Sequence, residues 1–305
     1  MNPRVIHGRA FLSSVVLCVF VLSPPVWSSP QKDSGETARQ EIEKLVAQSG
    51  AEVGVAFRTL DGKMSFFLQP ELPMHAASTM KVPVMIELFA QARAGKLRLD
   101  DELPVRNEFK SIVDGSPYQL DVNDDSDADV YKMVGKTMTL RALCEKMLTV
   151  SSNLATNLLI EKLGVENIKK RVHRLHADGM KVLRGVEDGK AFQKGLNNTT
   201  TAQALLILLE AIAKKRAGHP RDCDEMIAIL KRQQFNGAIP AGLPAGTPVA
   251  HKTGEITKIN HDAAIVYAPR PFVLVVMVRG MEDKKKSDAL IAAIAKTLNS
   301  ASQPR

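Results

Sequence analysis

Apolar residues near the start of the chain recur first at helical and then at strand spacing. Residues 38–48 carry apolar side chains every three or four positions and are followed by Gly50, which predicts an amphipathic helix. Two apolar runs, Val53–Thr59 and Lys63–Leu68, then flank the sequence Leu60-Asp61-Gly62. Asp-Gly between two such runs is typical of a tight hairpin, so we predict two antiparallel strands after the first helix.

The middle of the chain shows helical spacing throughout. From Thr79 to Ala94, apolar residues repeat every three or four positions and stop at Gly95, which predicts a helix that begins beside Ser78. Three further segments have the same spacing, namely 140–148, 154–163 and 202–215. We therefore expect only helices and loops in this part of the chain.

Strand patterns return towards the C-terminus. They cover 249–253, 263–267 and 272–278, and a helical pattern follows over 287–298. Strands at both chain ends that enclose a helical insertion predict an α+β fold, with an antiparallel sheet built from both ends, flanking helices and an all-helical lobe. We assign about 38–77 and 222–300 to the sheet lobe and about 78–221 to the helical lobe, and we expect the cleft where the lobes meet.

The first 28 residues differ from the rest of the chain. Arg4, His7 and Arg9 precede an apolar run, and small residues follow it up to Ser28, which is typical of a secretory signal peptide. The run holds roughly 13 residues, whereas a membrane anchor, the alternative, needs about 20. We predict cleavage after Ser28 or Ser29, which leaves 29–305 as one domain exported to the periplasm or the extracellular space, without a stable membrane span.

Composition argues against a nucleic-acid-binding protein. The formal net charge is +8, but runs of three basic residues such as Lys214-Lys215-Arg216 and Lys284-Lys285-Lys286 are more typical of solvated helix ends. An aromatic content of 5% also offers few partners for base stacking. Cys144 and Cys223 remain after the predicted cleavage, and we expect two free buried thiols rather than a disulfide.

Metal-binding patterns are also missing from the sequence. It contains neither C-x-x-C nor His-x-x-x-His spacing. Five Asp residues lie between 120 and 131, but an EF-hand-like loop from Asp121 would have Ser126 in place of glycine and Lys132 in place of the bidentate Glu. We therefore expect a solvated acidic loop, no metal site and no cofactor.

Three short motifs carry the candidate chemistry. In chain order they are Ser78-Thr79-Met80-Lys81, Ser151-Ser152-Asn153 and Lys252-Thr253-Gly254. The S-x-x-K pattern alone is weak, because Ser29 to Lys32 also fits it. The second and third motifs each occur once, so the ordered triple is far less probable by chance than any one member.

The motifs suit nucleophilic catalysis by a serine. Lys81 lies three positions after Ser78 on a predicted helix and would stand beside it, one turn further on. To act as a base near neutral pH, its pKa must fall by about 3 units, or about 4 kcal/mol, through burial and a second cation such as Lys252. Ser151 and Asn153 would complete its hydrogen bonds. The alternative is that Ser78 merely caps the helix and Lys81 is a surface lysine.

The segment that begins at Ser151 resembles the S-D-N-x-A-x-N-L-L signature of class A β-lactamases, and Asn197-Asn-Thr-Thr-Thr resembles the end of their Ω loop. The resemblance covers about residues 35–300 and implies one penicillin-recognising catalytic domain. It implies that Ser78 is acylated, that Lys81 is its base partner, that Ser151 shuttles a proton and that Asn153 binds the substrate amide. It also places Lys252 and Thr253 at the substrate carboxylate, and the backbone N–H groups of Ser78 and Glu255 in the oxyanion hole.

Release of the acyl group is where the sequence departs from the family. The Ω-loop carboxylate that activates water would be Glu187, but it is shifted by one residue relative to Arg184, and the Leu-Asn that should follow is absent. Asn198 stands where the family commonly has an Asp that pairs with the Arg. The alternative for Glu187 is a solvated loop carboxylate.

Three departures concern the binding cleft. Ser152 replaces the usual Asp, and Glu255 replaces a small residue after Lys-Thr-Gly. Near the family's carboxylate-binding Arg this chain offers Lys258 and His261, and His261 is either a substrate contact or a hydrogen-bonded structural histidine. Gly254 ends a strand pattern, which indicates close approach of a ligand backbone.

The sequence thus predicts a secreted β-lactamase that acts on a small-molecule β-lactam, and the resemblance implies that it is a monomer. One rival is a penicillin-binding-type D-Ala-D-Ala carboxypeptidase or a related peptidase or esterase, which uses the same motifs without the Ω-loop Glu. A second rival is a non-hydrolytic ligand-binding module that has kept the pocket.

Overall fold

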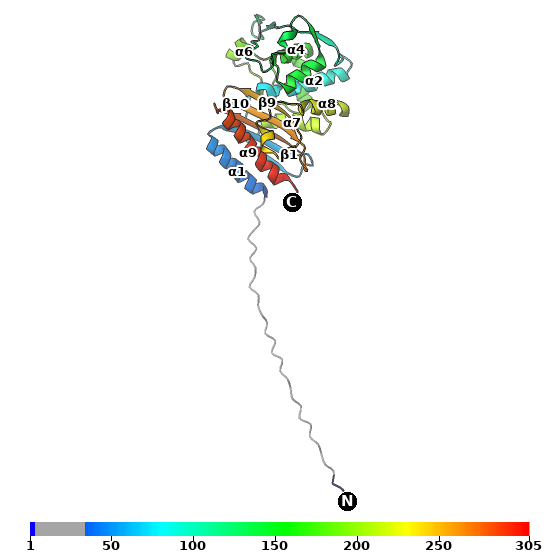
Figure 1. Ribbon diagram of the computed structural model, residues 1–305, viewed down its shortest axis with the longest axis vertical. Coiled ribbons are helices and arrows are strands. Elements are labelled where there is room, and N and C mark those ends of the chain that lie inside the picture. Colours follow the sequence, from blue (N-terminus) through cyan, green and yellow to red (C-terminus); the bar gives the residue numbers. More distant parts are fainter. Residues whose placement is uncertain (4–33, 305) are drawn as a thin grey trace. The chain divides into compact units, whose positions relative to one another are not determined.

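A five-stranded antiparallel sheet combines strands from the beginning and the end of residues 34–304 (Figure 1). The computed structural model describes residues 1–3 and 34–304, so most of the predicted signal peptide lies outside the described residues. The strands are β1 (Glu52–Thr59), β2 (Ser65–Leu68), β9 (Val249–Ile256), β10 (Ile259–Val266) and β11 (Phe272–Arg279), in the order β2-β1-β11-β10-β9. Both sequence ends contribute neighbouring strands, which confirms the predicted α+β class.

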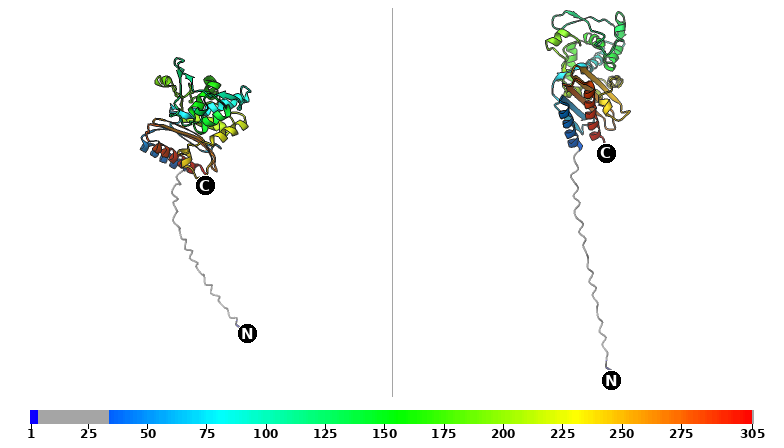
Figure 2. Two further views of the ribbon diagram at one scale, coloured as in Figure 1. Left: turned by 45° about the horizontal axis from the view of Figure 1, so that its top comes forward. Right: turned by 60° about the vertical axis from the view of Figure 1, so that its left-hand side comes forward.

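Two helices cover one face of this sheet side by side (Figures 1 and 2). They are α1 (Ser34–Ser49) and α9 (Lys284–Ser302). Ile42 of α1 and Ile291 of α9 are fully buried in the same cluster as Phe57 and Phe272, whose rings are 5.0 Å apart. Because α9 repeats apolar residues every three or four positions, it presents a continuous apolar stripe to the sheet.

The opposite face carries the helices that hold the candidate site. Helix α7 (Ala202–Ala213) is apolar on nearly all sides because it lies between the sheet and other helices, and α8 (Pro220–Leu230) packs beside it on β9. Beyond them lie α2 (Lys81–Arg93), α3 (Leu140–Thr149), α4 (Asn153–Leu163), α5 (Val165–Arg174) and α6 (Gly189–Gln193). Ten of the thirteen residues of α2 are buried, so it runs through the middle of the helical region.

We had predicted that the middle of the chain contains only helices and loops, and this prediction was wrong. It contains three two-stranded ladders that pair β3 (Met74–His75) with β8 (Thr199–Thr200), β4 (Glu102–Pro104) with β7 (Thr137–Thr139), and β5 (Phe109–Lys110) with β6 (Pro117–Tyr118). Three 3₁₀ turns also occur among the described residues, η1 (Ala77–Met80), η2 (Tyr131–Met133) and η3 (Ile239–Gly242). Strands of two or three residues are too short to show an alternating pattern, which explains the error.

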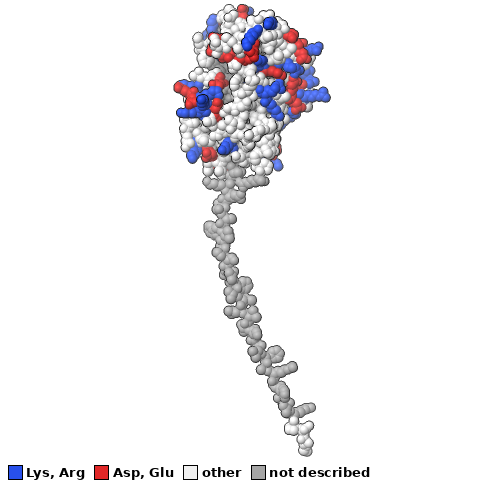
Figure 3. Space-filling view, viewed as in Figure 1, with Lys and Arg blue, Asp and Glu red and all other residues white. Residues whose placement is uncertain are grey.

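Surface charge and cysteines agree with the sequence analysis. Basic and acidic side chains lie intermixed on the face drawn in Figure 3. Cys144 on α3 and Cys223 on α8 are both buried and free. Among the described residues, no helix is long and apolar enough to span a bilayer.

Candidate active site

Ser78 lies in the turn η1, directly before α2, and faces a cleft. In a 3₁₀ turn residues three apart align, so Ser78 and Lys81, the first residue of α2, stand one above the other. Ser78 is not a helix cap, because Ala76 precedes η1 and Met80 precedes α2. Ala77 has a φ of +44°, a rare backbone conformation for a residue other than glycine, immediately before the serine.

Lys81 is fully buried and meets three acceptors. Its Nζ donates to Ser151 O at 2.7 Å, to Asn153 Oδ1 at 2.8 Å and to Ser151 Oγ at 3.1 Å. Burial lowers the pKa of Lys81 from 10.5 to about 7, although the nearby carboxylates of Asp125 and Glu187 oppose this shift. A buried lysine with this pKa can exchange a proton near neutral pH.

Ser151 joins the two lysines of the site. Its Oγ lies 3.1 Å from Lys81 Nζ and 3.1 Å from Lys252 Nζ, so a single hydroxyl bridges two amines. Burial and the charge of Lys81 lower the pKa of Lys252 well below its ordinary value, while Asp262 opposes the shift. Ser151 is held in a left-handed conformation, with a φ of +61°. The arrangement offers a short path for a proton between the two lysines.

The cleft beside these residues has a volume of about 690 Å³. Ser78, Ser151, Asn153, Thr253 and Glu255 line one part of it. Its other lining residues include Phe235, Ile256, Lys258, Lys284 and Asp288. The Glu255 carboxylate is 3.6 Å from Lys284 Nζ, so the acid that the sequence placed near the proposed carboxylate site has a basic neighbour.

Gly254 allows β9 to lie directly against η1. A Cβ at this position would be 3.0 Å from Thr79 Cγ2, 3.1 Å from Thr79 N and 3.2 Å from Ala76 O. We had interpreted this glycine as permitting the approach of a ligand backbone. The backbone that approaches it is the turn that carries Ser78, so Gly254 sets the distance between the first and third motifs.

Glu187 faces the helical side of the site. Its Oε1 accepts a hydrogen bond of 2.7 Å from Asn153 Nδ2, and Asn153 Oδ1 accepts from Lys81. Burial raises the pKa of Glu187, while the Asn153 bond opposes the shift. The residue is half-buried and has a φ of +61°. It is therefore tied to Lys81 through one amide rather than solvated in a free loop.

The ends of the loop around Glu187 are held by amide contacts. The Asn198 side chain accepts from the backbone N–H of Leu183 at 2.8 Å and donates to the carbonyl of Arg184 at 3.0 Å. The buried Arg184 guanidinium donates to Leu196 O and to Asn197 Oδ1. Neutral amide and carbonyl oxygens thus accept from Arg184 at the position where the sequence lacks the family's Asp.

His261 lies outside the residues that line the cleft. It is fully buried on β10, its Nε2 is 3.0 Å from His75 O, and its Nδ1 accepts from Val278 N at 3.2 Å. Burial lowers the pKa of His261 to about 4. Both ring nitrogens are occupied by backbone groups, which favours the hydrogen-bonded structural histidine over the substrate contact. Lys258, the other basic candidate, does line the cleft and pairs with Glu282.

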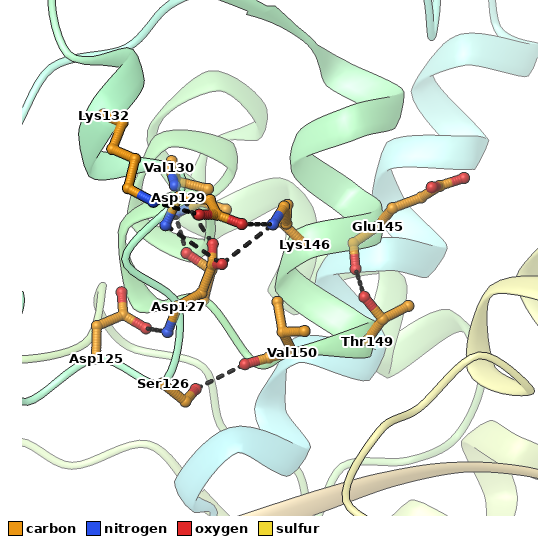
Figure 4. A network of polar contacts seen from close by, with 12 residues as sticks. Asp125, Ser126, Asp127, Asp129, Val130, Lys132, Glu145, Lys146, Thr149 and Val150 are labelled. Atoms are coloured by element: carbon orange, nitrogen blue, oxygen red, sulfur yellow. Dashed lines mark hydrogen bonds and ion pairs between the residues drawn. The ribbon is translucent and has the colours of Figure 1, made fainter.

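Sequence reasoning missed Asp125. We expected the loop 120–131 to be solvated, yet the Oδ2 atom of Asp125 accepts the backbone N–H groups of Asn153 and Leu154 at 2.8 and 3.0 Å. Asp127 is also buried and pairs with Lys146 at 3.1 Å (Figure 4). Five Asp residues in one short segment gave no local signal that would single out these two, because their partners lie about twenty or more residues away in the sequence.

The family model and the relatives that match this chain are both described as β-lactamases. The model of the β-lactamase enzyme family matches residues 37–301. The chain is 20% identical to β-lactamase VEB-1 of Pseudomonas aeruginosa, over 89% of this chain and 91% of that protein, and 25% identical to a β-lactamase of Citrobacter koseri, over 95% and 97%.

A solved structure extends the similarity to three dimensions. A mutant of PBP-A, described as an acyl-enzyme complex with penicillin G, superposes with a TM-score of 0.74 at 25% identity, over 87% of this chain and 96% of that one. The fold, the matched family model and these relatives agree, and the chain therefore belongs to the β-lactamase enzyme family.

Proposed function

We propose that this chain is a secreted serine β-lactamase that opens the β-lactam ring through an acyl-enzyme on Ser78. The observation that carries the proposal is the bridge from Lys81 through Ser151 to Lys252, at the edge of a cleft that Ser78 also lines. A buried amine with a pKa of about 7, three residues after Ser78, is suited to accept the proton of the serine hydroxyl.

Acylation follows from this arrangement. Ser78 Oγ attacks the lactam carbonyl carbon and its proton passes to the neutral amine of Lys81. The negative oxygen that develops is stabilised by the backbone N–H groups of Ser78 and Glu255, each worth about 10² to 10³ in rate. The C–N bond of the ring then breaks, and the proton moves from Lys81 through Ser151 Oγ to the leaving nitrogen.

Substrate binding uses the remaining motif residues. Lys252 and Thr253 hold the substrate carboxylate, and Asn153 contacts its amide. Lys284 lies beside Glu255 and offsets its charge, so that an anionic substrate is not repelled from this part of the cleft.

Release requires water to attack the ester. Glu187 accepts a proton from that water, and Asn153 holds the carboxylate in place through the 2.7 Å hydrogen bond. The raised pKa of Glu187 makes it a stronger base than an exposed glutamate. The ester carbon–oxygen bond then breaks, and the proton returns to Ser78.

A specific observation favours a second candidate function. Because the loop around Glu187 is closed by the amide of Asn198 and the family's Leu-Asn is absent, a penicillin-binding-type D-Ala-D-Ala peptidase would fit the same acylation site. Such an enzyme would form the penicillin ester but release it slowly.

One experiment separates these functions. The chain is incubated with a fluorescent penicillin and, separately, with a chromogenic cephalosporin. We expect rapid colour change and only transient label, and no label in Ser78→Ala. Lasting label without turnover would establish the peptidase-like alternative. Absence of label in the folded chain would contradict both functions and leave a non-hydrolytic binding module.

A further inference from the structure

The acidic loop 120–131 lies against the segment that carries Ser151 and Asn153. Ser126 Oγ donates to Val150 O at 2.6 Å, and Lys146 of α3 pairs with Asp127 and Asp129 (Figure 4). These contacts fix the loop to the end of α3, one residue before Ser151. The loop is therefore a support of the second motif rather than a surface excursion.

Within this loop, Asp125 is the residue that reaches the site. Four donors converge on its carboxylate. The backbone N–H groups of Asn153 and Leu154 and the hydroxyl of Tyr131, at 3.1 Å, contact Oδ2, while the N–H of Asp127 contacts Oδ1. A group that receives only donors suits the ionised carboxylate. The Asp125 carboxylate also lies at the N-terminus of α4, where a negative charge is favoured.

We propose that Asp125 is a positioning residue of the acylation site, which orients Asn153 between Lys81 and Glu187 and sets the charge balance of these two groups. The inference rests on the proposed function. Asp125 holds the backbone of Asn153, while the side chain of Asn153 contacts Lys81 on one side and Glu187 on the other. A displacement of Asp125 thus changes the geometry of both groups together.

The charge of Asp125 raises the pKa of both Lys81 and Glu187. The charged groups around Lys81 come from three elements, namely Lys252 on β9, Glu187 in its loop and Asp125. Asp125 raises the pKa of Lys81, against the larger effect of burial, and together with burial and Asp124 it raises the pKa of Glu187. Removal of its charge therefore lowers both pKa values, whichever group accepts the serine proton.

The test compares Asp125→Asn with Asp129→Asn, which removes the same charge from the same loop at an exposed residue bound to Lys132 and Lys146. The titration of Lys81 is followed by NMR in the whole folded chain, labelled with carbon-13 at lysine Cε. We expect the Lys81 midpoint to fall by about one pH unit in Asp125→Asn and to stay unchanged in Asp129→Asn. Asp125→Ser serves as a second neutral variant if the first does not fold.

The rate of labelling by a fluorescent penicillin gives the functional readout. We expect the rising limb of the pH profile to move to lower pH in Asp125→Asn, by the same amount as the NMR midpoint. In Asp125→Ala, the plateau should also fall roughly tenfold to a hundredfold, because Asn153 loses its support.

Two results would overturn the inference. One is an unchanged Lys81 midpoint in both neutral variants, and the other is an equal shift in Asp129→Asn. A purely structural role would lower the plateau without moving the limb. The NMR titration needs no substrate. A wild-type chain that does not label with penicillin would therefore refute the proposed function, while the titration would still show whether Asp125 changes the pKa of Lys81.

Discussion

The two sides of the cleft hold their reactive groups in different ways. On the sheet side, Ser78 and Lys252 lie on elements that touch at Gly254, where a methyl group would have to displace its neighbours. On the helical side, Glu187 lies on a loop whose ends are closed by neutral amides, and its carboxylate is held by Asn153. The geometry that we propose for acylation is therefore fixed by packing, whereas the geometry that we propose for release depends on a few hydrogen bonds.

The two sides of the cleft also differ in how strongly burial shifts the pKa values of their reactive groups. Lys81 and Lys252 are fully buried, and burial is the main cause of both lowered pKa values. Glu187 is only half-buried, and the Asn153 hydrogen bond partly cancels the effect of burial on its pKa. A change in the loop is thus expected to alter release more than acylation.

Loss of the buried amine should have the largest effect. Lys81→Ala removes the proton acceptor, so we expect the acylation rate of Ser78 to fall by about 10² to 10⁴. Lys96→Ala, an exposed lysine shortly after α2, should label at the wild-type rate. Stopped-flow labelling with a fluorescent penicillin measures both rates. Fast labelling of Lys81→Ala would show that another group activates Ser78.

Asn153 connects the two sides, so its loss should affect both steps. Asn153→Ala leaves Lys81 without one acceptor and Glu187 without its donor. We expect acylation and release each to slow by roughly tenfold to a hundredfold, since each loses a hydrogen bond to a charged group. Rapid-quench mass spectrometry separates the steps. An effect on one step alone would mean that Asn153 does not couple the two sides.

A methyl group at Gly254 tests whether packing fixes the acylation side. Gly254→Ala would push β9 away from Thr79, and we expect a loss of about 1–3 kcal/mol in unfolding free energy together with slower acylation. Gly218→Ala is the control, because a Cβ at Gly218 meets no atom within 4 Å. Denaturant unfolding measures stability. Equal stability of both variants would contradict the close contact.

The pH dependence of acylation should report the lowered pKa of Lys81. Because its pKa in the folded chain is about 7 instead of 10.5, the neutral amine forms above pH 7, and acylation is lost as the pH falls below this value. The rising limb should therefore have its midpoint near pH 7 in the wild type. In Glu187→Gln it should persist but move to lower pH, because the charge of Glu187 raises the pKa of Lys81. A limb above pH 9, or its loss in Glu187→Gln, would exclude Lys81 as the base.

The sequence predicted the acylation side far better than its surroundings. Ser78, Lys81, Ser151 and Lys252 come together because their motifs fall at a helix start, a helix cap and a strand, and each of these elements has a clear periodic pattern. The five-stranded sheet followed from the same patterns.

The features that the sequence did not reveal depend on contacts between distant segments. Asp125 caps a helix that begins 28 residues later, and no local pattern distinguishes it from its acidic neighbours. The sequence left two roles open for His261, and only the structure shows that backbone groups occupy both of its ring nitrogens. Helices α5, α6 and α8 were not predicted either. Helix α5 is rich in charged residues and buries only Ile168 and Val172, and α6 has only five residues.

The central claim, that acylation and release are held by separate parts of the site, is tested most directly by Glu187→Gln. The variant keeps an oxygen that can accept from Asn153 but cannot take a proton from water. The mass of the chain is followed during reaction with penicillin G, beside wild type and the exposed control Glu161→Gln. We predict an unchanged rate of adduct formation and a release rate lowered by about 10² to 10⁴ in Glu187→Gln alone. Wild-type release from Glu187→Gln, or equally slow formation of its adduct, would contradict the account.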